Sequence, residues 1–311
     1  MENKAMRDVL ADSLREMMFK DENIILMDAD LATANGTFDL RHDFPKRALT
    51  VGISEANMAS MAAGMSSYGL KPYISTFTAF ASRRIADQIA ISCAYAKQNV
   101  KIIATDAGIT SQTNGGTHMS MEDLGILRSI PETVVLDIVD ARQLEQAMPA
   151  IDAHYGVVYI RMVRKESPLV FGEDYKFNLF KGDLLKEGSD LTIVASGIMV
   201  SEAVEDAKIM EEQGINAEII AIHSLKPLDT EIIINSIKKT GALMTLDNHN
   251  IHGGLYSAVL EEVVADHPVI TKGIGVKDHF GEVGSTRFLM EKYGLDRDTI
   301  AREAKILLDR K

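Results

Sequence analysis

The chain has 311 residues, and its 45 acidic residues outnumber its 33 Lys and Arg, giving a formal net charge of -12. This balance argues against a nucleic-acid partner, because neutralising phosphates requires clustered Lys and Arg, and a hydrophobic content of 46% excludes disorder as the dominant state. No apolar run approaches the roughly 20 residues that a membrane span requires, and the length predicts two domains of ordinary size.

The first half of the chain alternates strand patterns with helical ones. In chain order, the sequence predicts a helix over 4–19, strands at 24–27 and 48–51, a helix over 54–65, a strand at 72–76, a helix over 83–97, a strand at 100–104, a helix over 121–128, a strand at 134–138, a helix over 141–155 and a strand at 157–161. A long polar segment, 106–118, interrupts this alternation. Loops of this length in a compact domain are usually functional or disordered.

A second alternation begins at residue 190. The sequence predicts strands at 191–196, 217–221 and 242–247 and helices over 200–213, 230–240 and 254–265. Strands that alternate with helices form parallel sheets through right-handed crossovers. We therefore expect an α/β fold of two domains, each a mostly parallel sheet flanked by helices, with a first domain over 1–170, a linker over 171–189 and a second domain over 190–311.

The N-terminus and the cysteine content predict where the protein works. The first residues, MENKAMRDVLADSL, contain no apolar core of the kind that a signal peptide needs. The single cysteine, Cys93, cannot form an internal disulfide. Both features predict a protein of the reducing cytoplasm.

Candidate functional residues follow the carboxyl ends of the predicted strands, where ligands bind in open parallel sheets. Glu55 follows one strand and lies one residue inside a helix start. Such a carboxylate either stabilises the helix N-terminus or is a buried acid beside a ligand nitrogen. Phe77 and Phe80, three residues apart at the next strand end, are either core residues or the stacking wall for a flat heterocycle.

The polar loop 106–118 ends in two glycines, a threonine and a histidine. Gly115 and Gly116 permit positive φ angles or a close backbone approach. A neutral His118 imidazole can exchange a proton or a hydrogen bond with a substrate hydroxyl. The alternative is a surface loop that carries an incidental histidine.

Three arginines are candidate anion binders. Arg161 ends a predicted strand and Arg164 follows it, whereas Arg7 lies on an amphipathic helix, where a surface salt bridge is the default. Near the C-terminus, His249 and His252 have helical spacing. Without further Cys or Glu ligands, these histidines predict no metal site in this chain.

Taken together, these segments resemble one family, transketolase, over essentially the whole chain. GISEANM resembles the family's G-x-x-E-x-x-M segment, and TFTAF resembles the aromatic segment that holds the thiamine aminopyrimidine. GGTHMSMEDLGILRSIPETVV resembles the G-x-T-H-x-x-x-E-x-L-x-x-x-R-x-x-P segment, and IHSLKPLD and NHNIHGGLYSAV resemble segments of the third domain. The resemblance implies a pyrimidine-binding domain followed by a transketolase C-terminal domain.

The resemblance also implies a cofactor that is shared with a second chain. The family binds thiamine diphosphate between two domains, and the other domain supplies a G-D-G…N segment for the diphosphate and the divalent metal. This sequence contains no such segment. The resemblance therefore implies the C-terminal subunit of a split transketolase. Its partner, an N-terminal subunit, would hold the metal, Mg or Ca, in an assembly of two copies of each chain.

On the cofactor side, the resemblance implies roles for five residues. Glu55 matches the glutamate that hydrogen-bonds the pyrimidine N1′ and favours the imino tautomer, which then deprotonates the thiazolium C2. Phe77 and Phe80 match the pyrimidine pocket, and Asp30 matches an acidic residue near the thiazolium. Arg83 stands where the family has a tyrosine beside the pyrimidine pocket.

On the substrate side, His118 matches a histidine that binds donor-sugar oxygens, and Arg7 and Arg161 match arginines of the phosphate site. Three positions here depart from the family, and one of them is Ala34, which stands in place of a serine of the phosphate pocket. Asp106 replaces a phosphate-contacting histidine and would repel a phosphate placed in the usual way, and Asn114 replaces an aspartate that reads a substrate hydroxyl. These departures favour ketol transfer on a sugar with a different far end, either a branched sugar phosphate or a sulfonated sugar.

Three alternatives stay open at the level of sequence. The β subunit of a 2-oxoacid dehydrogenase E1 component has the same domain order and glutamate, and RRIADQIA resembles it. The DAG start of the polar loop resembles 1-deoxyxylulose 5-phosphate synthase. The third alternative is a non-catalytic partner subunit, against which the presence of Glu55, the two phenylalanines and His118 argues.

Overall fold

Six strands from the first half of the chain, together with one strand from the second half, build a seven-stranded sheet. The computed structural model describes residues 4–311, and in it the strand order of this sheet is β10-β5-β6-β4-β3-β1-β2. All neighbouring strands are parallel except β10 and β5. The strands are β1 (Ile24–Asp28), β2 (Ala48–Thr50), β3 (Lys71–Phe77), β4 (Lys101–Thr105), β5 (Thr133–Asp137), β6 (Val157–Met162) and β10 (Ser224–Lys226).

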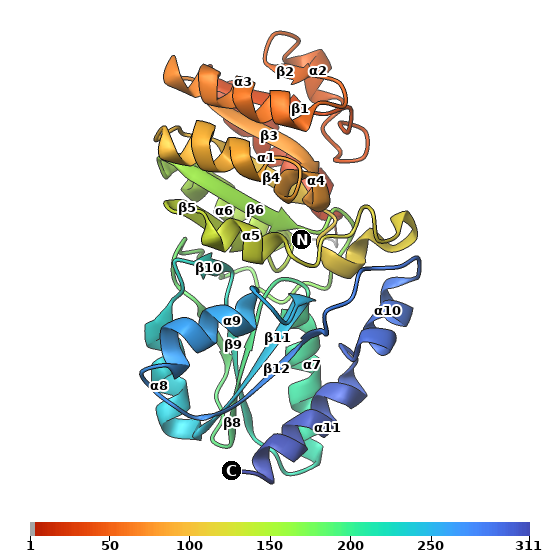
Figure 1. Cartoon of the computed structure of the whole chain (residues 1–311), viewed down its shortest axis with the longest axis vertical. Helices are drawn as coiled ribbons and strands as arrows, with labels where there is room; N and C mark the ends of the chain where they lie inside the picture. Colours follow the sequence, from red (N-terminus) through yellow and green to blue (C-terminus); the bar gives the residue numbers. More distant parts are fainter. Residues whose placement is uncertain (1–3) are drawn as a thin grey trace.

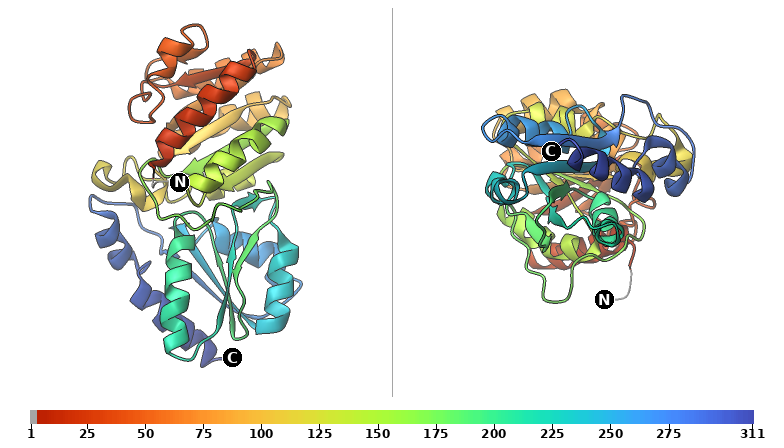
Figure 2. Two further views of the ribbon diagram at one scale, coloured as in Figure 1. Left: turned by 180° about the vertical axis from the view of Figure 1, so that it is seen from behind. Right: turned by 90° about the horizontal axis from the view of Figure 1, so that it is seen from below.

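Helices cover both faces of this sheet because its strands are apolar on both faces. The helical segments are α1 (Met6–Lys20), α2 (Leu40–Asp43), α3 (Glu55–Ser67), α4 (Thr78–Ser82), the π-helix η1 (Gln88–Tyr95), the 3-10 helix η2 (Gly108–Asn114), α5 (Asp123–Ser129) and α6 (Ala141–Ala153). In β1, Ile24 and Leu26 pack with α1 and α6, whereas Ile25 and Met27 pack with α3 and η1. Figure 2 shows α1 and α6 side by side on the rear face.

The second half builds a five-stranded sheet of order β12-β11-β8-β9-β7, parallel except for β7. Its elements are β7 (Asp183–Lys186), β8 (Leu191–Ala195), α7 (Met199–Glu212), β9 (Ala217–Ala221), α8 (Thr230–Thr240), β11 (Ala242–Asn250), α9 (Leu255–Val259), the π-helix η3 (Leu260–Val264), β12 (Ile270–Val276), α10 (Thr286–Tyr293) and α11 (Arg297–Leu308). α7 and α11 pack on one face, and α8 and α9 pack on the other. No helix within residues 4–311 combines the length and the apolar character needed to cross a membrane.

The two sheets, each flanked by helices, confirm the expected fold class (Figure 1). The segment 171–189, which we expected to be a linker, contains β7, and this strand pairs with β9 at the edge of the second sheet. β10 comes from the second half of the chain but extends the first sheet. The helix expected over 83–97 is shorter than predicted: residues 83–85 form a turn, and the helical residues are 86–95, of which 88–95 form the π-helix η1.

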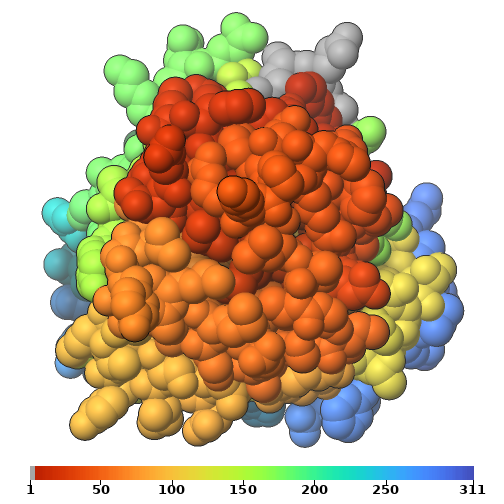
Figure 3. All heavy atoms as spheres, turned by 90° about the horizontal axis from the view of Figure 1, so that it is seen from above, coloured from red at the N-terminus to blue at the C-terminus, as the bar shows by residue number. Residues whose placement is uncertain are grey.

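The polar loop 106–118 lies where the two domains meet. A Cβ added to Gly116 would stand 2.3 Å from the carbonyl oxygen of Gly281, so the two backbones are in direct contact. Viewed from above the first domain, the yellow atoms of this loop form the rim beside the blue C-terminal segment (Figure 3). The loop that carries His118 is thus placed by both domains.

Candidate active site

Four predicted site residues come from neighbouring strand ends and helix starts. Glu55 begins α3, Phe77 ends β3, Phe80 lies in α4 and His118 ends the polar loop after β4. The ring centroids of Phe77 and Phe80 are 6.2 Å apart, and His118 lies 6.1 Å from Phe77 and 5.2 Å from Phe80. We call these three rings the aromatic cluster. The structure therefore brings together residues that the sequence placed on separate segments.

Glu55 is buried beside this cluster. Only 3% of its side chain is exposed, and its Oε1 accepts a hydrogen bond from Arg84 Nη1 at 2.7 Å. The guanidinium carbon of Arg84 lies 4.0 Å from the centroid of the Phe80 ring. Arg84 thus links the carboxylate to the aromatic cluster. Sequence reasoning missed Arg84, although its spacing of four residues from Phe80 was an available signal.

Both domains hold the polar loop in place. Ser111 Oγ donates to the carbonyl oxygens of Asp106 and His118, at 3.0 and 3.1 Å. From the second domain, Thr286 Oγ1 at the start of α10 accepts a hydrogen bond from Gln112 Nε2 at 2.6 Å. These contacts fix the backbone on which the His118 ring is presented to the two phenylalanines.

Arg83, which we predicted beside the pyrimidine pocket, contacts the end of this loop. Its Nη2 donates to the carbonyl oxygens of Thr117 at 3.1 Å and Met119 at 3.4 Å. Its Nε lies 3.1 Å from Glu122 Oε1. Arg83 therefore braces the loop that carries His118.

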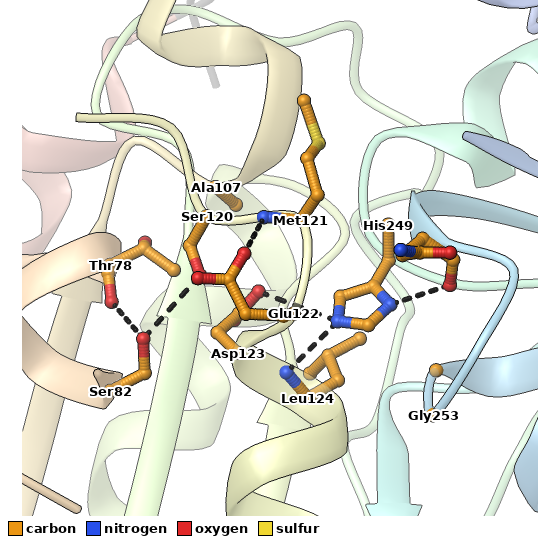
Figure 4. Close-up of polar contacts among 12 residues, drawn as sticks. Thr78, Ser82, Ala107, Ser120, Met121, Glu122, Asp123, Leu124, His249 and Gly253 are labelled. Atoms are coloured by element: carbon orange, nitrogen blue, oxygen red, sulfur yellow. Dashed lines mark hydrogen bonds and ion pairs between the residues drawn. The ribbon is translucent and has the colours of Figure 1, made fainter. Parts of the chain in front are cut away.

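A second set of polar contacts lies behind the loop (Figure 4). Ser82 Oγ donates to the Thr78 carbonyl oxygen at 2.7 Å and faces Ser120 Oγ at 3.4 Å. His249 Nε2 accepts a hydrogen bond from the Leu124 backbone amide at 3.2 Å, so this histidine stabilises the first turn of α5. Across residues 4–311, no group of three or more His, Cys, Asp or Glu side chains is placed to hold a metal ion.

Asp106 does not face the site as a free carboxylate. It is buried, and its Oδ1 accepts a hydrogen bond from Arg164 Nε at 2.8 Å. Burial raises the pKa of Asp106, and the hydrogen bond from Arg164 opposes that rise. The Arg164 guanidinium carbon also lies 5.0 Å from the centroid of the Phe77 ring. Asp106 thus anchors a cation on the wall of the aromatic cluster.

Arg161 is not available to a ligand, which contradicts its predicted role as an anion binder. Its side chain is 1% exposed. Its Nε, Nη1 and Nη2 donate to Asp123 at 2.9 Å, Asp137 at 3.0 Å and the Asn248 carbonyl oxygen at 2.6 Å. The physical reason is that the second domain packs over this strand end and completes a buried ion-pair network.

The remaining predicted residues, Arg7, Asp30 and Asn114, are exposed. Asp30 has a positive φ of 62° in the turn after β1. The backbone amide of Arg7 donates to the Arg164 carbonyl oxygen at 3.1 Å, and its Nε lies 3.5 Å from Asp8 Oδ1. Arg7 is therefore a neighbour of Arg164.

Comparison with known proteins identifies matching domain families and relatives of similar length. The chain matches two domain families, "Transketolase, pyrimidine binding domain" over residues 2–169 and "Transketolase, C-terminal domain" over residues 181–300. A 6-deoxy-6-sulfo-D-fructose transketolase subunit from Clostridium sp. (strain MSTE9) is 46% identical over 311 residues, covering 100% of this chain and 97% of that protein. A subunit of the apulose-4-phosphate transketolase from Phocaeicola vulgatus is 30% identical over 301 residues, covering 96% of each.

A solved structure agrees with these sequence matches. A split gene transketolase, described as an inactive β4 tetramer, superposes with a TM-score of 0.91 at 38% identity and covers 98% of this chain and 99% of that one. Two matched domains account for most of the chain, and the relatives match it over nearly their whole length. The chain therefore belongs to the transketolase family, of which it comprises the pyrimidine-binding and C-terminal domains.

Proposed function

We propose that this chain is the C-terminal subunit of a thiamine-diphosphate-dependent transketolase that moves a two-carbon ketol unit from a sulfonated ketose to an aldose. The observation that carries the proposal is the grouping of Glu55, the aromatic cluster and the anchored Arg164 at one sheet edge. This grouping combines a buried acid, apolar ring faces and a fixed cation, which together suit a flat cofactor and an anionic sugar.

The residues at this edge fit an aminopyrimidine. The position of Arg84 tests this fit. Its planar guanidinium donates a hydrogen bond to Glu55 and also lies over the Phe80 ring. A flat group is therefore accommodated between the buried carboxyl group of Glu55 and an aromatic face. Thiamine diphosphate, when bound, supplies the electron sink that allows the C2–C3 bond of a ketose to break.

The chain's own residues would prepare and protect this chemistry. Glu55 would hydrogen-bond a pyrimidine nitrogen through its carboxyl group. Phe77 and Phe80 supply apolar surface that excludes water and orients the ring. His118, edge-on to both phenylalanines, hydrogen-bonds the hydroxyls of the sugar and can carry a proton between them and solvent.

For the far end of the sugar, we propose a sulfonate held by Arg164. Among the described residues, Asp106 accepts a hydrogen bond from Arg164 Nε, and the two Nη groups of Arg164 would then bind the anion. The relative that is 46% identical over the whole chain is named for 6-deoxy-6-sulfo-D-fructose, and this supports a sulfonated donor. Asn114 and Arg7, both exposed on neighbouring segments, complete the proposed substrate side. Asp30 remains the proposed neighbour of the thiazolium.

The assembly that we propose has two copies of this chain and two of an N-terminal subunit. That partner would hold the diphosphate together with the divalent metal, Mg or Ca. A split-gene relative is described as an inactive tetramer of β chains, which supports the need for a second kind of subunit. We also propose that the enzyme works in the cytoplasm, since its single cysteine, Cys93, is buried and unpaired.

The test uses the assembled complex with thiamine diphosphate and Mg²⁺. Sulfofructose, fructose 6-phosphate, xylulose 5-phosphate and apulose 4-phosphate are compared as donors with glyceraldehyde 3-phosphate as acceptor, and products are measured by mass spectrometry. We expect a four-carbon sulfonated aldose, formed with a kcat/KM roughly tenfold or more above those of the phosphates. A preference for any phosphate donor would overturn the sulfonate assignment, and full activity of the Glu55→Gln complex would overturn the catalytic one.

A further inference from the structure

Arg84 makes two contacts that together define a binding place. Its Nη1 donates to Glu55 Oε1 at 2.7 Å, and its guanidinium carbon lies 4.0 Å from the centroid of the Phe80 ring. Its side chain is 45% exposed, whereas that of Glu55 is 3% exposed. A solvent-facing arginine thus reaches inward and places its planar head against a buried acid.

The same two contacts are those that an aminopyrimidine ring would need. A pyrimidine nitrogen must reach the Glu55 carboxyl group, and the ring face must lie against an aromatic side chain. The guanidinium is also planar, and it lies between the same two partners, the carboxyl group of Glu55 and the ring of Phe80. Two flat groups cannot occupy one place beside Phe80, so Arg84 and the ring exclude each other.

We propose that the Arg84 side chain occupies the binding site of the pyrimidine ring and competes with it. Cofactor binding then requires this side chain to move away from Glu55 and Phe80. This inference rests on the thiamine-diphosphate function proposed above. The exposure of Arg84 supports it, because a half-exposed side chain on a short helical turn can leave without disturbing the core.

The contact has a defined consequence for cofactor affinity. When a binding place is occupied by the chain's own side chain most of the time, the apparent dissociation constant rises by the inverse of the fraction that is open. Both contacts of Arg84, the charged hydrogen bond and the stacking on Phe80, favour the occupied state. Removing them should therefore tighten cofactor binding and speed cofactor loading.

The test measures thiamine diphosphate binding to the assembled complex by calorimetry, without any substrate. We expect Arg84→Ala to lower the dissociation constant by on the order of tenfold, and Arg84→Gln to act in the same direction. Arg84→Lys keeps the charge beside Glu55 but loses the planar stack, so its affinity should fall between those of the wild type and Arg84→Ala. Arg287→Ala is the matched control, because 91% of the Arg287 side chain is exposed and its ion pair within residues 4–311 is with Glu291 of the same helix, α10.

The outcomes separate this inference from the proposed function. If the wild-type complex binds no thiamine diphosphate, the proposed function fails and Arg84 has no cofactor to exclude. Suppose instead that the wild type binds the cofactor and that Arg84→Ala keeps the wild-type melting temperature. If this variant then binds the cofactor with equal or lower affinity, Arg84 does not compete with the cofactor. Should Arg84→Ala unfold, Arg84→Gln and Arg84→Lys give the same comparison, because both keep a long polar side chain at the position.

Discussion

Among single residues, Asp106 shows most clearly how a neighbouring residue changes the role of a side chain. An unpaired carboxylate would repel an anionic sugar, and the sequence supports that expectation. In the structure, the carboxylate instead binds Arg164 Nε at 2.8 Å and holds the guanidinium against Phe77. The guanidinium of Arg164 is thereby held in a fixed orientation beside Phe77, and the proposed anion would bind at its remaining N–H groups.

The role of Arg164 can be tested directly. We expect Arg164→Gln to raise the KM for an anionic donor by about tenfold or more, because a hydrogen bond to a charged group contributes about 1.5–3 kcal/mol. Steady-state kinetics should show a smaller change in kcat, since the anion lies away from the reacting carbons. Arg287→Gln, on the exposed face of α10, should leave both constants unchanged. An equal loss with an uncharged ketose would contradict the anion-binding role.

The sequence predicted some of these residues and not others for a physical reason. Glu55, Phe77, Phe80 and His118 follow from strand ends and loop composition, which are local features. Arg161 also ends a strand, but its partner Asn248 is 87 residues away and comes from the other domain. No local sequence pattern predicts which strand end will be covered by a second domain.

At the scale of elements, the polar loop 106–118 depends on a glycine contact with the second domain. A Cβ on Gly116 would lie 2.3 Å from the Gly281 carbonyl oxygen, a distance that forces one backbone to move. We expect Gly116→Ala to lower kcat/KM by tenfold or more, because roughly 1 Å of misplacement can cost about 100-fold. Gly172→Ala is the control, since a Cβ there meets nothing within 4 Å. Kinetics equal to those of the control would show that the loop tolerates the shift.

Helix α7 carries a buried carboxylate that makes stability depend on pH. Asp206 is fully buried, and within the described chain neither oxygen has a hydrogen-bond partner. Burial raises the pKa of Asp206 from 3.8 to about 7, and Glu202 adds to the rise. Since the folded pKa lies above the unfolded one, the contribution of Asp206 to stability is complete below pH 3.8 and is lost progressively as pH rises through about 7.

Replacing this carboxyl group should remove that dependence. We expect Asp206→Asn to raise the melting temperature by a few degrees at pH 8 and by clearly less at pH 5, as measured by scanning calorimetry. The difference between the two pH values is the diagnostic quantity, because any packing effect of the amide acts equally at both. The same shift at both pH values would show that Asp206 stays ionised when folded.

The elements that the sequence missed have weak or short patterns. β7 and β10 have four and three residues, too few for a period to show, and they were placed at sheet edges by tertiary pairing. β12 includes Gly273 and Gly275 and is only partly buried at its start. α10 and α11 had usable signals in their N-caps, Ser285 and Asp296, which accept hydrogen bonds from the amides of Phe288 and Thr299.

For the whole molecule, the buried network around Arg161 joins the two domains. Arg161 pairs with Asp123 and Asp137 on the first domain and with the Asn248 backbone on the second. We expect Arg161→Ala to lower the free energy of unfolding by about 3–5 kcal/mol, because it leaves two buried carboxylates unpaired. Urea denaturation measures this loss.

The control for this prediction is an exposed ion pair. Arg302→Ala removes a side chain that is 59% exposed and 3.8 Å from Glu303, so its cost should stay below about 1 kcal/mol. Similar losses in the two variants would contradict the idea that the Arg161 network holds the domains together.

The central claim is that this chain is one half of a shared active site, and native mass spectrometry of the complex purified gently from its own cells tests it most directly. The prediction is an assembly of two copies of the 34.1 kDa chain with two copies of a second, N-terminal subunit of roughly 30 kDa and bound thiamine diphosphate. A homo-oligomer that carries neither a partner nor the cofactor would contradict the account.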